Sequence, residues 1–122
     1  MMRKFSQRIV GVVVVGLSFI AGPYGEAESP LREDAVAMAR NGRTDAAIAT
    51  LRELLASDPD DRLAAYDLAV ILTWVGRNRE AIDAFEKAKG DEPPEYVLGP
   101  IIRAYRDQKR FEEAERWARA AR

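Results

Sequence analysis

The stretch VGRNREA at residues 75–81 decides the fold, because related stretches occur at nearly constant distances on either side of it. NGRTDAA occupies residues 41–47, and QKRFEEA occupies residues 108–114. The alanines that end the three stretches lie 34 and 33 residues apart. Sequence repeats of this length are typical of proteins in which one helical or mixed unit is stacked on the next. The chain is therefore predicted to be a repeat protein.

Each repeat is predicted to contain two helices joined by a short turn. Gly42 and Gly76 suit the end of a first helix, where the backbone needs a residue that tolerates positive φ. Thr44 and Asn78 follow two residues later and are predicted to cap the second helix through their side-chain oxygens. Between the turns, apolar residues recur with the i, i+3, i+4, i+7 spacing of a helix. Helices are expected at residues 30–41, 44–57, 61–75, 78–90, 94–108 and 111–122.

The first 27 residues have the layout of a secretory signal peptide. Three basic residues up to Arg8 are followed by an uncharged apolar run at residues 9–22 and then by small residues ending at Ala27. This order predicts export to the periplasm with cleavage after Ala27. The alternative is an uncleaved anchor in the inner membrane, although the 14 apolar residues fall short of the roughly 20 needed to span a bilayer core.

The remaining chain, residues 28–122, is predicted to be the repeat domain. Its repeats are expected at about residues 28–61, 62–94 and 95–122. The chain contains no cysteine and no histidine, which removes disulfides, thiolate metal sites and the commonest general base. Its 19 basic and 20 acidic residues are well mixed, which gives no support to nucleic-acid binding. No catalytic residue, metal or cofactor is therefore predicted.

These repeats resemble the tetratricopeptide repeat family over residues 28–122. The resemblance implies an all-α fold, a right-handed superhelix of about three helix–turn–helix repeats. It also implies a non-enzymatic scaffold that binds protein partners. Phe111 and Trp117 in the third repeat have no following helix to cover them in this sequence. Self-association through that repeat is therefore a further expectation.

A narrower resemblance rests on residues 66–77, 94–98 and 103–107. These stretches resemble the periplasmic repeat region of the poly-β-1,6-N-acetylglucosamine exporter family, although the sequence contains no series of strands for that family's outer-membrane barrel. The resemblance implies a role in export of biofilm polysaccharide, in association with the outer membrane. It implies a partially deacetylated polymer as ligand and a periplasmic deacetylase as partner. The alternative is a generic scaffold that holds the proteins of an envelope complex together.

In the tetratricopeptide family the first helices of successive repeats line a concave groove. Aligning the repeats places Arg32, Val36 and Arg40 on this surface. Trp74 is predicted either to face a ligand or to pack against the next repeat. Arg40, Arg103 and Arg106 are predicted either to bind an acidic or carbonyl-rich ligand or to be solvated. The candidate binding residues of the last two repeats are Tyr66, Val70, Thr73, Trp74, Arg103, Arg106 and Asp107.

Overall fold

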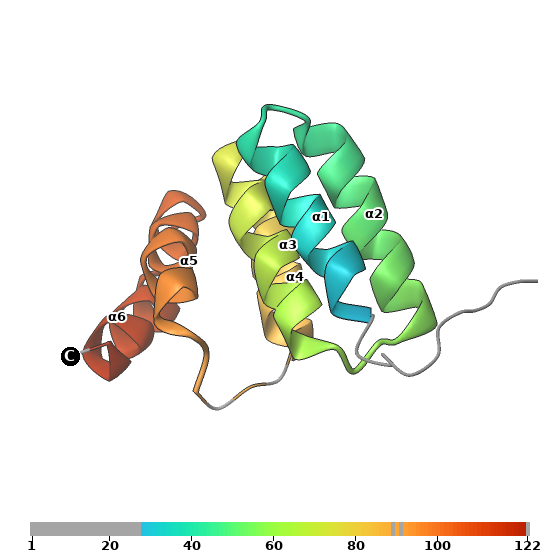
Figure 1. Cartoon of the computed structure of the whole chain (residues 1–122). Coiled ribbons are helices and arrows are strands. Elements are labelled where there is room, and N and C mark those ends of the chain that lie inside the picture. Colours follow the sequence, from blue (N-terminus) through green and yellow to red (C-terminus); the bar gives the residue numbers. More distant parts are fainter. Residues whose placement is uncertain (1–27, 89, 91, 122) are drawn as a thin grey trace, which may run out of the picture. The chain divides into compact units, whose positions relative to one another are not determined.

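Six α-helices joined by short turns make up the described part of the protein. The computed structural model describes residues 28–88, 90 and 92–121, so the predicted signal peptide and its alternative lie outside the described residues. From Leu31 onward the described residues form one compact unit. The helices are α1 (Glu28–Arg40), α2 (Thr44–Ser57), α3 (Arg62–Trp74), α4 (Asn78–Ala88), α5 (Glu95–Asp107) and α6 (Phe111–Ala120) (Figure 1).

The predicted all-α fold is confirmed. Every predicted helix is present, and its ends lie within two residues of the predicted ends. No strand occurs among the described residues. Within the same residues, no helix has both the length and the apolar character that crossing a membrane would require.

The turn inside each helix pair is the same backbone motif. Gly42 and Gly76 have φ angles of 88° and 79°, and Lys109 takes the equivalent position with φ of 63°. In each turn the next residue donates its N–H to a carbonyl in the last turn of the preceding helix, at 2.8, 2.9 and 2.8 Å. These bonds satisfy carbonyl groups that a helix end would otherwise leave unpaired. The third turn adopts this geometry without the glycine that favours it.

The predicted capping roles of Thr44 and Asn78 need correction. Both are the first residues of their helices, and the preceding cap position of α2 is Arg43, whose side chain makes no capping bond. The Asn78 side-chain amide instead donates to the Asp107 carboxylate in α5 at 3.1 Å. A side-chain cap is present on α3, where Asp61 accepts from the Ala64 N–H at 3.1 Å.

Helix α3 is the centre of the fold. All nine residues from Ala64 to Leu72 are buried, as expected for a helix that is apolar on nearly every side. It contacts α2, α4 and α5. Different faces of α3 therefore meet different neighbouring helices. Leu51, Ile71, Leu72, Ile101 and Tyr105 are among the largest fully buried side chains.

An aromatic cluster joins the second and third repeats. The Phe85 ring lies 5.8 Å from the Tyr66 ring and 5.1 Å from the Trp117 ring, measured between centroids. Tyr66 is only 3% exposed, and its hydroxyl lies so close to Gly90 that a Cβ there would be 1.9 Å away. A larger residue at position 90 would therefore force the Tyr66 side chain to move.

Candidate functional site

The first helices of the three repeats enclose a groove of about 660 Å³. This volume falls in the range of ordinary ligand sites. Its wall is mostly apolar in its middle and charged at the α1 side. The lining residues are Arg32, Glu33, Val36, Ala37 and Arg40 from α1, Asp67, Val70, Ile71 and Trp74 from α3, and Tyr96 and Pro100 from α5.

A buried carboxylate ties the three groove helices together. Asp67 on α3 is 5% exposed and is the buried charged residue of the described core. It accepts a hydrogen bond from the Arg32 guanidinium on α1 at 2.5 Å and another from the Tyr96 hydroxyl on α5 at 2.6 Å. Buried charges are stable only when paired and hydrogen-bonded, and Asp67 receives one donor from each neighbouring repeat.

The pKa values of both donors reflect this arrangement. Burial by itself would lower the pKa of the Arg32 guanidinium, but its hydrogen bond and attraction to Asp67 outweigh burial and raise that pKa. Burial of the Tyr96 hydroxyl, followed by its hydrogen bond to the Asp67 carboxylate, raises the Tyr96 pKa well above its ordinary value. Arg32 is therefore charged and Tyr96 neutral at any physiological pH.

Trp74 and Tyr96 are the two large apolar side chains that the groove leaves half-exposed. Trp74 is 51% exposed at the end of α3, while Val70, one turn earlier, is 8% exposed. Val36 and Ala37 on α1 and Pro100 on α5 also line the groove. An indole ring on a rigid helix, with its N–H still able to donate, is the type of side chain that anchors a partner at a binding surface.

The predicted candidate residues fall into different places. Val70 and Trp74 line the groove, together with Arg32, Val36 and Arg40 from the first repeat. Tyr66, predicted to lie on the groove surface, is instead buried in the core on the Phe85 side of α3, because the helix turns about 100° per residue and Asp67 takes the groove-facing position.

Four predicted residues lie outside the lining of this groove. Thr73 is half-buried, and its hydroxyl donates to the Val70 carbonyl of the preceding turn at 2.6 Å. Arg103 and Arg106 are exposed on α5. Asp107 accepts the Asn78 amide and joins the second and third repeats.

Six lining residues of the groove were not predicted from the sequence, and two of them, Asp67 and Tyr96, hold the groove helices together through hydrogen bonds. The available signal was an acidic residue inside an apolar helix, since a charge flanked by buried positions requires a partner. The identity of the partners depends on how the repeats stack. No group of three metal-ligating side chains occurs among the residues that the structure describes.

Comparison of the chain with known protein families and solved structures agrees with this architecture. The family model for the tetratricopeptide repeat matches residues 38–99, just over half of the chain, so the chain belongs to the tetratricopeptide repeat family. It is similar to a solved structure of a MamA point mutant, with 25% identity and a TM-score of 0.66 over 80% of this chain and 56% of that one. A structure of MamA AMB-1 gives 25% identity and a TM-score of 0.64 over 80% and 60%.

The chain thus spans somewhat more than half the length of these MamA chains. No curated protein matches it. Members of the tetratricopeptide repeat family are generally non-enzymatic modules that bind protein partners.

Proposed function

We propose that this protein is a binding module that holds a segment of a partner protein in the groove between α1, α3 and α5. The single observation that carries the proposal is Trp74, a half-exposed indole on the wall of a preformed groove. The Arg32–Asp67–Tyr96 contacts hold the three helices, so the groove exists before the partner arrives. Preorganisation of this kind lowers the entropic cost of binding.

The groove's own charges define what it should bind. Asp67 is neutralised by Arg32, which leaves Glu33 and Arg40 as the charged residues at the α1 wall. The partner segment should therefore place an apolar or aromatic side chain against Trp74, Val70 and Val36. Charge should contribute less to affinity than the indole contact, because Glu33 and Arg40 are both exposed to solvent.

A peptide-display selection tests the proposal. Linear peptides selected on the full chain should bind Trp74→Ala at least about tenfold more weakly, as expected for a central aromatic anchor. Leu63→Ala is the matched control, because Leu63 is a 45% exposed residue of the same helix that does not line the groove. Selected peptides that bind Trp74→Ala as tightly as the wild type would refute the assignment of the groove.

A finer version of the proposal gives the module a role in export of poly-β-1,6-N-acetylglucosamine in the periplasm. The exposed indole supports it, since an aromatic face stacks well on a sugar ring. Tyr66, which was predicted to lie on the groove surface, is buried, so Trp74 would act with Tyr96 instead. Saturable binding of partially deacetylated oligomers that Trp74→Ala abolishes would support this role. A flat titration of the folded protein would exclude it for this groove.

A further inference from the structure

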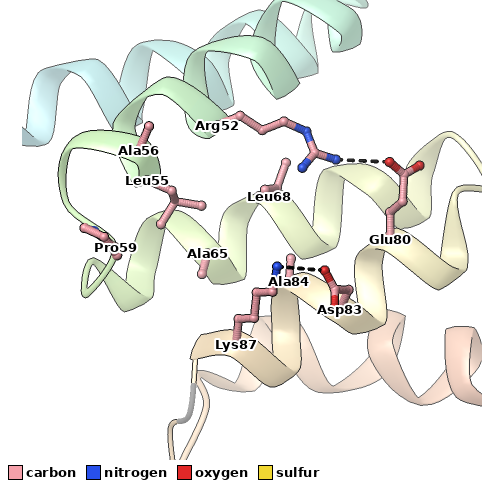
Figure 2. Close-up of a pocket in the computed structure, with 10 residues that line it drawn as sticks. All are labelled: Arg52, Leu55, Ala56, Pro59, Ala65, Leu68, Glu80, Asp83, Ala84 and Lys87. Carbon is pink, nitrogen blue, oxygen red and sulfur yellow. Dashed lines mark hydrogen bonds and ion pairs between the residues drawn. The ribbon is translucent and has the colours of Figure 1, made fainter.

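A second groove lies between α2 and α4, with α3 as its floor (Figure 2). Its volume is about 410 Å³, and none of its lining residues belongs to the α1/α3/α5 groove. Leu68 and Ala65 of α3 form the floor and are almost fully buried. Leu55 and Ala56 of α2 and Ala84 of α4 form apolar walls. The exposed apolar surface of this groove therefore comes from its α2 side, where Ala56 and Pro59 are exposed and Leu55 is half-buried.

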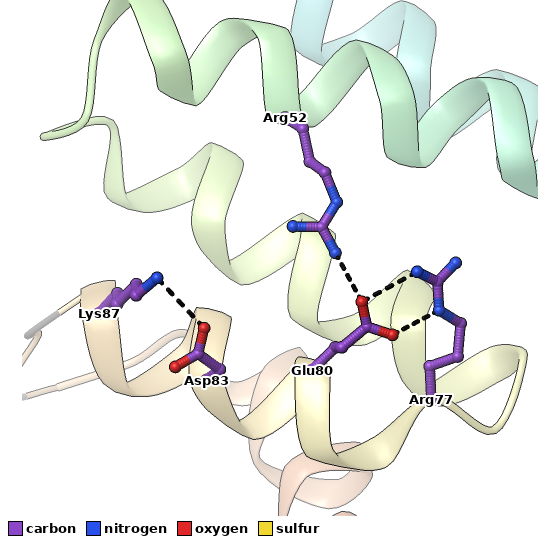
Figure 3. Close-up of polar contacts among 5 residues, drawn as sticks. All are labelled: Arg52, Arg77, Glu80, Asp83 and Lys87. Atoms are coloured by element: carbon purple, nitrogen blue, oxygen red, sulfur yellow. Dashed lines mark hydrogen bonds and ion pairs between the residues drawn. The ribbon is translucent and has the colours of Figure 1, made fainter.

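The charged rim of this groove is unevenly paired (Figure 3). Arg77 binds the Glu80 carboxylate through two hydrogen bonds, from Nε at 2.6 Å and from a terminal nitrogen at 2.9 Å. Arg52 reaches across from α2 to the same carboxylate with one longer bond of 3.2 Å. Two guanidinium groups therefore share one carboxylate, and the bidentate partner has the better geometry.

Arg77 dominates the electrostatics of this cluster. Its hydrogen bond is the main cause that lowers the Glu80 pKa, and attraction from Arg52 is the smallest contribution. The negative charge of Asp45 also helps to raise the pKa of Arg77. At the other end of the rim, Lys87 pairs with Asp83 one helical turn away at 3.2 Å. Release of Arg52, unlike release of Lys87, would leave no carboxylate without a partner, because Arg77 still binds Glu80.

We propose that the α2/α4 groove is a second docking site, for a segment of a partner protein that presents apolar side chains next to a carboxylate. The apolar side chains would cover Leu55, Ala56 and Pro59. The carboxylate would bind Arg52, which turns away from Glu80 while Arg77 keeps Glu80 neutralised. Charge complementarity favours this occupant, since the apolar α2 side of the groove lies next to a guanidinium that Glu80 binds through a single long contact. The inference does not depend on the function of the α1/α3/α5 groove.

The test uses a set of acetylated, amidated peptides that carry two leucines and one glutamate at varied spacing, with glutamine in place of glutamate as the matched peptides. Amide chemical shifts of the isotope-labelled full chain report where each peptide binds. The proposal expects shifts confined to the α2/α4 groove. It expects Arg52→Gln to weaken the best glutamate peptide about tenfold and to leave its glutamine counterpart unchanged, since charge-assisted pairing is what the variant removes.

Three controls separate the proposal from its competitors. Lys87→Gln removes a cation of the same rim that has its own partner, so it should change affinity less than about twofold. Trp74→Ala should leave these affinities unchanged. Ala56→Gln fills the groove from an exposed position and should abolish binding while the thermal unfolding of the protein is preserved.

Several results would overturn the proposal. They are the absence of shifts in the α2/α4 groove with every peptide, and an equal effect of Arg52→Gln on glutamate and glutamine peptides. A third is sedimentation that shows a concentration-dependent dimer of the peptide-free chain which Arg52→Gln abolishes. That last result would make a second copy of this chain the occupant.

Discussion

The two grooves beside α3 handle charge in opposite ways. In the α1/α3/α5 groove, Asp67 is 5% exposed and bound from both sides by Arg32 and Tyr96. In the α2/α4 groove, the side chains of Arg52 and Glu80 are 49% and 45% exposed, and Glu80 is also bound by Arg77. The first groove uses its charge to fix the spacing of three repeats. The second keeps its charges at the surface, where a partner is able to exchange them.

The largest expected effect comes from removing the buried carboxylate. Asp67→Ala leaves Arg32 and the Tyr96 hydroxyl without their partner and should lower the free energy of unfolding by about 2–4 kcal/mol. The expected loss lies toward the low end of the range for breaking a buried ion pair, because the Arg32 side chain is 21% exposed. The matched control is Asp83→Ala in the other groove, which should change stability very little. Chemical denaturation measures both, and equal losses would refute the comparison.

The second-largest expected effect comes from Tyr96, the α5 residue whose hydroxyl donates to Asp67. Tyr96→Phe removes one hydrogen bond to the buried Asp67 and should cost about 1–2 kcal/mol of unfolding free energy. Tyr105→Phe removes a similar hydroxyl, which donates at 2.8 Å to Glu86. Glu86 is 46% exposed and also binds Arg110, so the second variant should lose less. Urea unfolding measures both losses. A larger loss of unfolding free energy in Tyr105→Phe would show that the hydrogen bond to Asp67 stabilises the fold less than the hydrogen bond to Glu86.

Alkaline pH should weaken the fold through the same tyrosines. The pKa of Tyr96 and the pKa of Tyr105 are raised in the folded protein, mainly by burial and then by a carboxylate partner. Above about pH 10, their ordinary pKa, the unfolded chain loses these protons before the folded chain does. Rising pH then favours unfolding. The melting temperature should fall above pH 10 and fall less steeply in Tyr96→Phe; identical slopes would contradict this assignment.

The smallest expected effect concerns the pKa of Glu80 at the rim of the α2/α4 groove. Arg77 lowers the Glu80 pKa in the folded protein, so this pair stabilises the fold above the ordinary Glu pKa and loses that contribution as pH falls through the folded value. Arg77→Gln should bring the Glu80 pKa back toward its ordinary value, whereas Arg52→Gln should barely move it. A carboxyl-detected NMR titration measures both variants. A larger shift in Arg52→Gln would show that Arg52 is not the dispensable partner.

The helices and turns were predictable because their determinants are local. Gly42 and Gly76 mark the left-handed turn, and the apolar period fixes the helical segments between. The third turn was also found, although Lys109 replaces glycine there, because the spacing of the repeats located it. The whole fold class followed from these signals.

The site was less predictable because it depends on which side of α3 each residue occupies. Val70 and Trp74 were placed by alignment of the repeats and do line the groove. Tyr66 and Asp67 are adjacent in sequence, yet one packs on Phe85 and the other meets Arg32 and Tyr96. The contacts of Asp67 span 35 and 29 residues. Such distant pairings follow from stacking geometry, which the periodicity of a single helix does not contain.

The most direct test of the central claim is site-specific photocrosslinking in cells that produce the full chain. A photoreactive amino acid replaces Ala37, an exposed residue of the α1/α3/α5 groove, or Ala49, an exposed α2 residue that lines neither groove. The account predicts an adduct with a partner protein from position 37 that disappears in the Trp74→Ala background, and no such adduct from position 49. An adduct from position 37 that persists without Trp74, or the same adduct from both positions, would contradict it.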